Sequence, residues 1–150
     1  MEKSIRQLES IIAGYKDQLN SLNEEQWMYR PGPAKWSRKE VLGHLIDSAQ
    51  NNIRRFIVAQ YEDRPKIAYA QDNWVAAAHY QNYATPDLVA LWLLLNRHVC
   101  MVLKNIPAGV AERLCDTGEL RSIRWLAEDY NKHLLHHLHQ VLSLEPVPYP

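Results

Sequence analysis

The stretch SRKEVLGHLIDSAQNNIRRF, residues 37–56, has the features of a long helix that begins at its first residue. The Ser37 hydroxyl can accept a hydrogen bond from the backbone amide of Glu40, and the Glu40 side chain can reach back to the amide of Ser37, which is a capping box. Apolar side chains then recur every three or four residues, as on one face of a helix; they are Val41, Leu42, Leu45, Ala49, Ile53 and Phe56. The stretch predicts a helix over about 38–61.

The same periodicity predicts three more long helices in the chain. Thr85 followed by Pro86 is typical of a helix start, because proline fits the first helical position. The predicted ranges are 3–22, 86–105 and 122–144, with a short helix after Asp72 and a loop over 106–121. We therefore predict an all-α fold, an up-down four-helix bundle with one extra short helix, as a single domain over residues 1–150.

Charge and composition exclude several classes of protein. Lys plus Arg number 17 and so do Asp plus Glu, without a long block of one sign, which argues against a nucleic-acid partner. No apolar run reaches the ~18 residues that cross a membrane, and no apolar segment follows the N-terminus as in a signal peptide. Cys100 and Cys115 form no zinc-binding spacing and are expected to be free thiols. These features predict a cytoplasmic protein that binds neither nucleic acid nor membranes.

Four of the seven histidines crowd into NKHLLHHLHQ, residues 131–140. A helix turns about 100° per residue. At that angle His137 falls inside the apolar face of the predicted helix over 122–144, and His133 lies at its edge. His136 and His139 fall away from the apolar face, so we expect them to face solvent. The angles therefore predict that His133 and His137 point into the core, one turn apart.

Two imidazoles one turn apart can present their nitrogens to a common point, as metal ligands do. The spacing alone is weak evidence, because it occurs by chance on many helices, and a site needs at least a third ligand. His44 lies at the flank of the apolar stripe in residues 38–61, where it can reach a neighbouring helix. On geometry alone His44 can equally be a surface residue.

KWSRKEVLGHLIDSA (residues 35–49), followed some ninety residues later by YNKHLLHHLHQVL (residues 130–142), resembles the DinB-like superfamily of metalloenzymes. The resemblance covers nearly the whole chain. It implies a four-helix bundle that holds a divalent metal ion, zinc or nickel, through three histidines. Matched to this sequence, the ligands are His44, His133 and His137, the same trio that the helical angles favour.

Three protein ligands leave at least one position on a metal ion for water or substrate, which is typical of catalytic rather than structural sites. The resemblance implies either hydrolysis or transfer of a low-molecular-weight thiol to an electrophile. We therefore predict a metal-dependent hydrolase or thiol-dependent transferase that acts on a small molecule. The alternative is a non-catalytic stress-response protein that binds a metal or a small ligand.

Several polar residues lie one helical turn from the predicted ligands. Glu40, Asp129 and Gln140 are in position to orient the imidazoles, although each can serve helix capping or solvation instead. Ser48 and Asn52 project on the same side as the predicted ligand of their helix. These five residues are the candidates for contact with the ligands or the substrate.

Two leucines on the last predicted helix suggest an assembly. Leu135 and Leu142 lie one heptad apart and opposite the core stripe, and Trp125 lies on an adjoining face. The family resemblance also implies dimers. The chain is therefore predicted to form a two-fold homodimer through helix faces.

Overall fold

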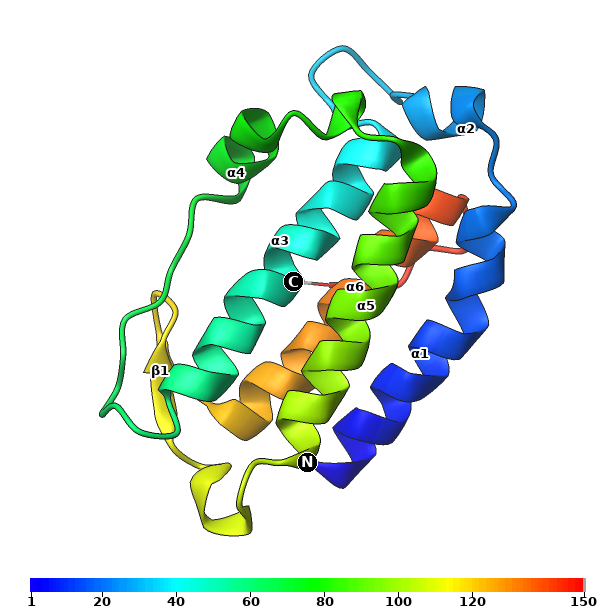
Figure 1. Cartoon of the computed structure of the whole chain (residues 1–150). Helices are drawn as coiled ribbons and strands as arrows, with labels where there is room; N and C mark the ends of the chain where they lie inside the picture. Colours follow the sequence, from blue (N-terminus) through cyan, green and yellow to red (C-terminus); the bar gives the residue numbers. More distant parts are fainter. Residues whose placement is uncertain (150) are drawn as a thin grey trace.

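Four long helices form the bundle in this computed structural model, which describes residues 1–149 (Figure 1). They are α1 (Glu2–Asn20), α3 (Arg38–Val58), α5 (Thr85–Lys104) and α6 (Ile123–Leu142). Both α1 and α3 pack mainly against α5 and α6, so α1 and α3 occupy opposite corners of the bundle. In the view of Figure 1, α1 and α6 run upward, whereas α3 and α5 run downward. The predicted all-α four-helix bundle is confirmed.

Shorter elements connect the long helices. The short helix expected after Asp72 is α4 (Gln71–Ala78), which is followed by the 3-10 turn η1 (Tyr80–Asn82). This segment returns the chain to the top of the bundle, which lets α3 and α5 run in parallel (Figure 1). The sequence did not predict α2 (Glu24–Met28), which begins at a capping box between Asn23 and Gln26.

The predicted loop over 106–121 contains regular structure, so that prediction is partly wrong. After the 3-10 turn η2 (Ala108–Val110), strands β1 (Leu114–Asp116) and β2 (Leu120–Ser122) form an antiparallel hairpin. Its turn depends on Gly118, which has a φ of 113° and donates its amide hydrogen to Asp116 Oδ1 at 2.9 Å. The Ile67 amide also donates to the Asp116 carbonyl at 2.8 Å. Strands of three residues are too short to show an alternating pattern.

The start of α3 is the predicted capping box. The Ser37 hydroxyl accepts from the Glu40 amide at 3.1 Å, and Glu40 Oε2 accepts from the Ser37 amide at 2.8 Å. Glu40 also forms an ion pair with Arg30 at 2.8 Å. Its carboxylate therefore stabilises the first turn of α3 and is used there rather than at the histidines.

The connection after α4 packs tightly onto α3 at Gly43. A Cβ atom at this position would lie 2.1 Å from Cδ2 of Tyr80, which is closer than side chains approach one another. The Tyr80 hydroxyl donates to the buried Asp47 carboxylate, one turn further along α3. The absence of a side chain at Gly43 therefore lets Tyr80 anchor η1 directly beside the helix turn that carries His44.

By length and composition α5 could cross a membrane, with a mean hydropathy of 1.4 over its most apolar window. A core helix can meet the same criterion, and 39% of that window is buried in the bundle. The helix packs against α1 and α3 and contributes Leu88, Trp92 and Cys100 to the core. Cys100 and Cys115 are both buried free thiols, as the sequence predicted.

The predicted exposure of Leu135 and Leu142 is wrong. Both are partly buried and pack against the core. The reason is that α6 packs on both α1 and α3, so it buries a wider arc than a single stripe; Leu138 within this arc is fully buried. Only Trp125 of the predicted face is exposed, beneath the Arg121 guanidinium at 4.4 Å from its ring centroid. The two leucines are therefore mostly used in the packing of the bundle, and the homodimer stays a prediction.

Candidate metal centre

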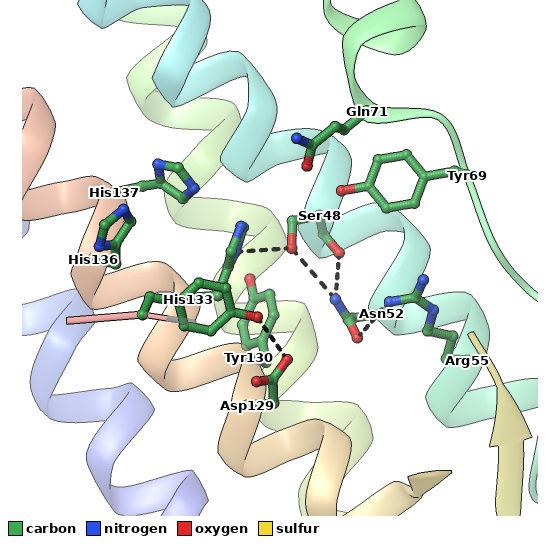
Figure 2. Close-up of a pocket in the computed structure, with 11 residues that line it drawn as sticks. Ser48, Asn52, Arg55, Tyr69, Gln71, Asp129, Tyr130, His133, His136 and His137 are labelled. Atoms are coloured by element: carbon green, nitrogen blue, oxygen red, sulfur yellow. Dashed lines mark hydrogen bonds between the residues drawn. The ribbon is translucent and has the colours of Figure 1, made fainter. Parts of the chain in front are cut away.

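A polar cavity of about 430 Å³ lies between α3, α6 and the segment that precedes α4 (Figure 2). This volume is within the range of about 300–1,000 Å³ that is usual for small-molecule sites. Its lining comprises Ser48, Asn52, Arg55, Tyr69, Gln71, Asp129, Tyr130, His133, His136, His137 and Tyr149. Three of the residues predicted near the site, Ser48, Asn52 and Asp129, are thus in its walls.

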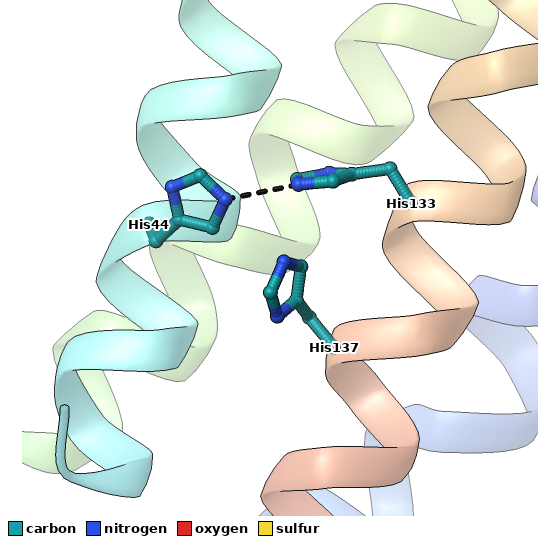
Figure 3. Close-up of side chains that lie close together, drawn as sticks. All are labelled: His44, His133 and His137. Carbon is teal, nitrogen blue, oxygen red and sulfur yellow. Dashed lines mark hydrogen bonds between the residues drawn. The ribbon is translucent and has the colours of Figure 1, made fainter. Parts of the chain in front are cut away.

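The structure brings together the three histidines that were predicted as ligands (Figure 3). His44 comes from α3, and His133 and His137 come from successive turns of α6. One ring nitrogen from each lies within 4.8 Å of the others, and the Nε2 atoms of His44 and His133 are 2.9 Å apart. His44 is fully buried, whereas His133 and His137 are half-buried and open into the cavity.

Burial keeps the three imidazoles neutral. It lowers the pKa of His44 to about 4, with a smaller contribution from repulsion by His137. For His133, burial and the neighbouring histidines lower the pKa to about 2. Burial also lowers the pKa of His137, against the opposing effect of its hydrogen bond with Gln140. Neutral imidazoles carry the lone pairs that a metal ion requires.

Hydrogen bonds to the other ring nitrogens indicate which nitrogen of each histidine is available to a metal ion. Nδ1 of His137 lies 2.9 Å from Oε1 of Gln140, and because an amide oxygen only accepts, Nδ1 donates its hydrogen there. The Nε2 lone pair of His137 is therefore available to the centre. Ser48 Oγ is 3.5 Å from Nδ1 of His133. Nδ1 of His44 is buried without a hydrogen-bond partner among residues 1–149.

This donor set fits a divalent ion. Nitrogens bound at about 2.0–2.1 Å, with ligand angles of about 90–109°, lie about 2.8–3.4 Å apart. At 2.9 Å the Nε2 atoms of His44 and His133 lie within this range, and a nitrogen of His137 lies within 4.8 Å of a nitrogen of each. Imidazole is a preferred ligand of zinc, nickel and copper. Among the described residues no fourth histidine, cysteine or carboxylate joins the cluster, so a coordination position remains for another ligand.

The C-terminal tail changes the surroundings of the other two histidines. His136 and His139 were expected to face solvent, but both are half-buried. Nδ1 of His136 donates to the Val147 carbonyl at 2.7 Å, and Nδ1 of His139 donates to the Glu145 carbonyl at 2.6 Å. The tail thus folds back over α6, which the periodicity of the sequence did not predict.

Tyr149 completes one wall of the cavity. Its ring packs against His133, with centroids 5.2 Å apart, and its hydroxyl donates to Asp129 Oδ2 at 3.0 Å. Tyr149 and Arg55 are site residues that the sequence reasoning missed. A signal existed for Arg55, because it continues the face of α3 that carries His44, Ser48 and Asn52.

Comparisons with known proteins agree with this geometry. The DinB superfamily pattern matches residues 7–141. A protein of Oceanobacillus iheyensis named "Putative metal-dependent hydrolase OB0782" is 30% identical over 148 residues, which cover 93% of this chain and 83% of that protein.

Two solved structures share the fold. YfiT from Bacillus subtilis, described as a probable metal-dependent hydrolase with an unusual four-helix bundle topology, superposes with a TM-score of 0.85 at 21% identity, over 95% of this chain and 83% of its own. A mycothiol-dependent maleylpyruvate isomerase superposes with a TM-score of 0.74 at 13% identity, over 97% and 61% respectively.

Proposed function

The chain belongs to the DinB superfamily, and on that premise we propose that it is a metal-dependent enzyme that acts on a small molecule. The observation that carries the proposal is the convergence of three neutral imidazoles, from His44, His133 and His137, at the wall of a polar cavity. Three protein ligands leave room for water or substrate on the ion, whereas closed structural zinc sites usually have four. Zinc and nickel are the ions that we expect.

The chain's own residues prepare the centre for this chemistry. A divalent ion bound there supplies a Lewis acid that activates water or a thiol. Gln140 fixes the ring orientation of His137, and Ser48 lies next to His133, so the imidazoles are held before an ion arrives. Tyr149 covers one side of the cavity and limits the access of bulk water.

Hydrolysis is the reaction class that we favour. The relative at 30% identity and YfiT are both described as hydrolases that depend on a metal. Thiol transfer is the second candidate, and its support is the shared fold with a mycothiol-dependent isomerase. In that case a low-molecular-weight thiol would occupy the open coordination position.

Metal content separates these proposals from a purely structural histidine cluster. Protein purified without a histidine tag should contain about one divalent ion per chain by elemental analysis. His44→Ala, His133→Ala and His137→Ala should each lose most of it, whereas His136→Ala and His139→Ala serve as matched controls and should retain it. Loss in His136→Ala equal to that in His137→Ala would mean that the ligand set is wrong.

Turnover then distinguishes an enzyme from a binding protein. The metal-loaded protein should hydrolyse members of an ester and amide panel, or join a small thiol to an electrophile, and His133→Ala should abolish that activity. Stoichiometric metal without turnover in either panel would favour the non-catalytic metal-binding function instead.

A further inference from the structure

Arg55 lies on the same wall of the cavity as Ser48 and Asn52, which come from the helix that carries His44. His44, Ser48, Asn52 and Arg55 follow one another along α3 at steps of four, four and three residues, so they share one face of the helix. Figure 2 shows Ser48, Asn52 and Arg55 in a row along this helix, with His133 and His137 opposite. The cavity therefore has imidazoles at one end and a guanidinium at the other.

The guanidinium of Arg55 is held in place but is not neutralised. Its Nε donates to the Ile67 carbonyl at 3.0 Å, and Nη1 lies 3.4 Å from Oδ1 of Asn52. Nη2 has no hydrogen-bond partner among residues 1–149, and no carboxylate in that range lies within 4.0 Å of the group. Asp129 lines the same cavity, but its Oδ2 already accepts from the Tyr149 hydroxyl.

The described contacts of this half-buried cation are all with neutral groups, including the face of the Tyr69 ring, whose centroid lies 5.8 Å from Cζ. An anion bound beside it would offset the cost of burying the charge. Burial is the largest influence on the pKa of Arg55 and lowers it, while the nearby groups act in the opposite direction, Tyr69 most strongly, followed by Cys115, Asp129 and Tyr149. Arginine presents paired N–H groups that match the two oxygens of a carboxylate. With a single arginine and the carboxylate of Asp129 nearby, the cavity suits a singly charged group better than a phosphate dianion.

We propose that Arg55 is the substrate-anchoring residue of this cavity and that the substrate is a small molecule with a carboxylate. The inference rests on the proposed function, because it names the substrate class of the same site. The Cα atoms of His44 and Arg55 are about 16 Å apart along the helix axis, from a rise of 1.5 Å per residue. The carboxylate bound by Arg55 is therefore separated from the reacting group at the imidazoles by several atoms of the substrate.

Binding of simple probes to the metal-loaded protein tests this proposal. In isothermal titration, glutarate should bind the wild-type protein at least about tenfold more tightly than its diamide, because its carboxylates offer charge-assisted hydrogen bonds to Arg55. A carboxylate can also ligate the metal ion, so the loss in the Arg55 variants assigns the effect to Arg55. Arg55→Gln should weaken glutarate binding by about tenfold or more, and Arg55→Lys by less. Arg54→Gln is the matched control, because Arg54 is the adjacent residue of α3 and is exposed; it should bind glutarate as the wild type does.

Each result has a defined meaning. Equal affinity of the wild-type protein for glutarate and the diamide would overturn the proposal, and that comparison remains valid if Arg55→Gln fails to fold. Unchanged glutarate binding in Arg55→Gln that retains its metal would also overturn it, and tighter binding of inorganic phosphate would assign the cavity to phosphate instead. Failure of the proposed function has a different signature, namely wild-type protein that binds no divalent ion.

Discussion

Replacing Asp47 by Asn should remove the part of the pH dependence of stability that comes from titration of this buried carboxyl. Asp47 is buried on α3, where one carboxylate oxygen accepts from the Tyr80 hydroxyl and the other has no partner among residues 1–149. Burial raises the pKa of this carboxyl from 3.8 to about 6, and the hydrogen bond from Tyr80 reduces that rise only in part. The native protein therefore holds a proton on Asp47 that the unfolded chain releases.

The sign and size of the effect follow from this difference. Between about pH 4 and 6 the native state binds more protons than the unfolded state, so stability decreases as pH rises through that window. A shift of about two pH units at 1.36 kcal/mol each corresponds to about 3 kcal/mol, present in full below pH 4 and lost by pH 7. Asparagine does not titrate. The free energy of unfolding of Asp47→Asn minus that of the wild type should thus increase by about 2–3 kcal/mol from pH 4 to pH 7.

Urea denaturation at a series of pH values, in the presence of a chelator, measures this difference directly. The trend with pH is the informative quantity, because a constant offset between the variants includes the altered hydrogen bonding of the amide. Asp17→Asn, at an exposed position of α1, is the matched control and should give a flat difference. A flat line for Asp47→Asn as well would show that the native carboxyl is solvated and that the burial argument fails.

Four further results are expected. Gly43→Ala should destabilise the fold by about 1–3 kcal/mol in thermal or urea unfolding, because its Cβ would overlap a buried tyrosine ring. Gly14→Ala is the control: no atom would lie within 4 Å of its Cβ in α1, so the substitution should stabilise the fold by up to about 1 kcal/mol. Gln140→Leu should weaken metal binding about 10–100-fold in a competition titration, since the adjacent ligand loses its orienting acceptor. Removal of residues 145–150 should speed metal extraction by a chelator severalfold, because the tail covers the cavity. The predicted homodimer should sediment at about twice the 17.5 kDa of one chain at tens of micromolar, and a 17.5 kDa species alone would contradict it.

Helical geometry fixes the direction of each side chain, which is why the sequence could predict that two of the three clustered histidines lie together. Residues four apart on α6 had to point the same way, and the structure places His133 and His137 together. Geometry left His44 undecided, since the sequence alone does not say which helices are neighbours. Packing of α3 against α6 settles that question. Arg55 was within reach of the same reasoning, as the next member of a polar row, but its significance depends on a cavity that only the folded chain shows.

The remaining differences between the prediction and the structure arise where contacts between residues far apart in sequence determine the local structure. The hairpin of β1 and β2 has strands of three residues and is joined by a backbone hydrogen bond from Ile67, far away in sequence. The tail carries no periodic pattern, yet its carbonyl groups bind His136 and His139. Tyr15 of α1 also contacts the His139 ring, with its hydroxyl 2.6 Å from Nε2. Exposure of Leu135 was predicted from a single apolar stripe, whereas α6 has two packing partners.

The polar side chains of α3 differ in how far the rest of the protein satisfies their hydrogen-bonding groups. Asp47 can lose its charge by taking up a proton, and its other oxygen accepts from the Tyr80 hydroxyl, so the cost of burying this carboxyl is reduced within the fold. A change of protonation does not help His44 in the same way, because its imidazole is already neutral and Nδ1 is without a partner among residues 1–149. Arg55 likewise keeps unused donors beside the cavity. An incompletely satisfied polar group in a low-dielectric interior is costly. At Arg55, which lines the cavity, a bound anion would offset that cost. The nitrogen of His44 that faces His133 is Nε2, and a metal ion would bind there, whereas the unpartnered Nδ1 would stay without a partner among the described residues.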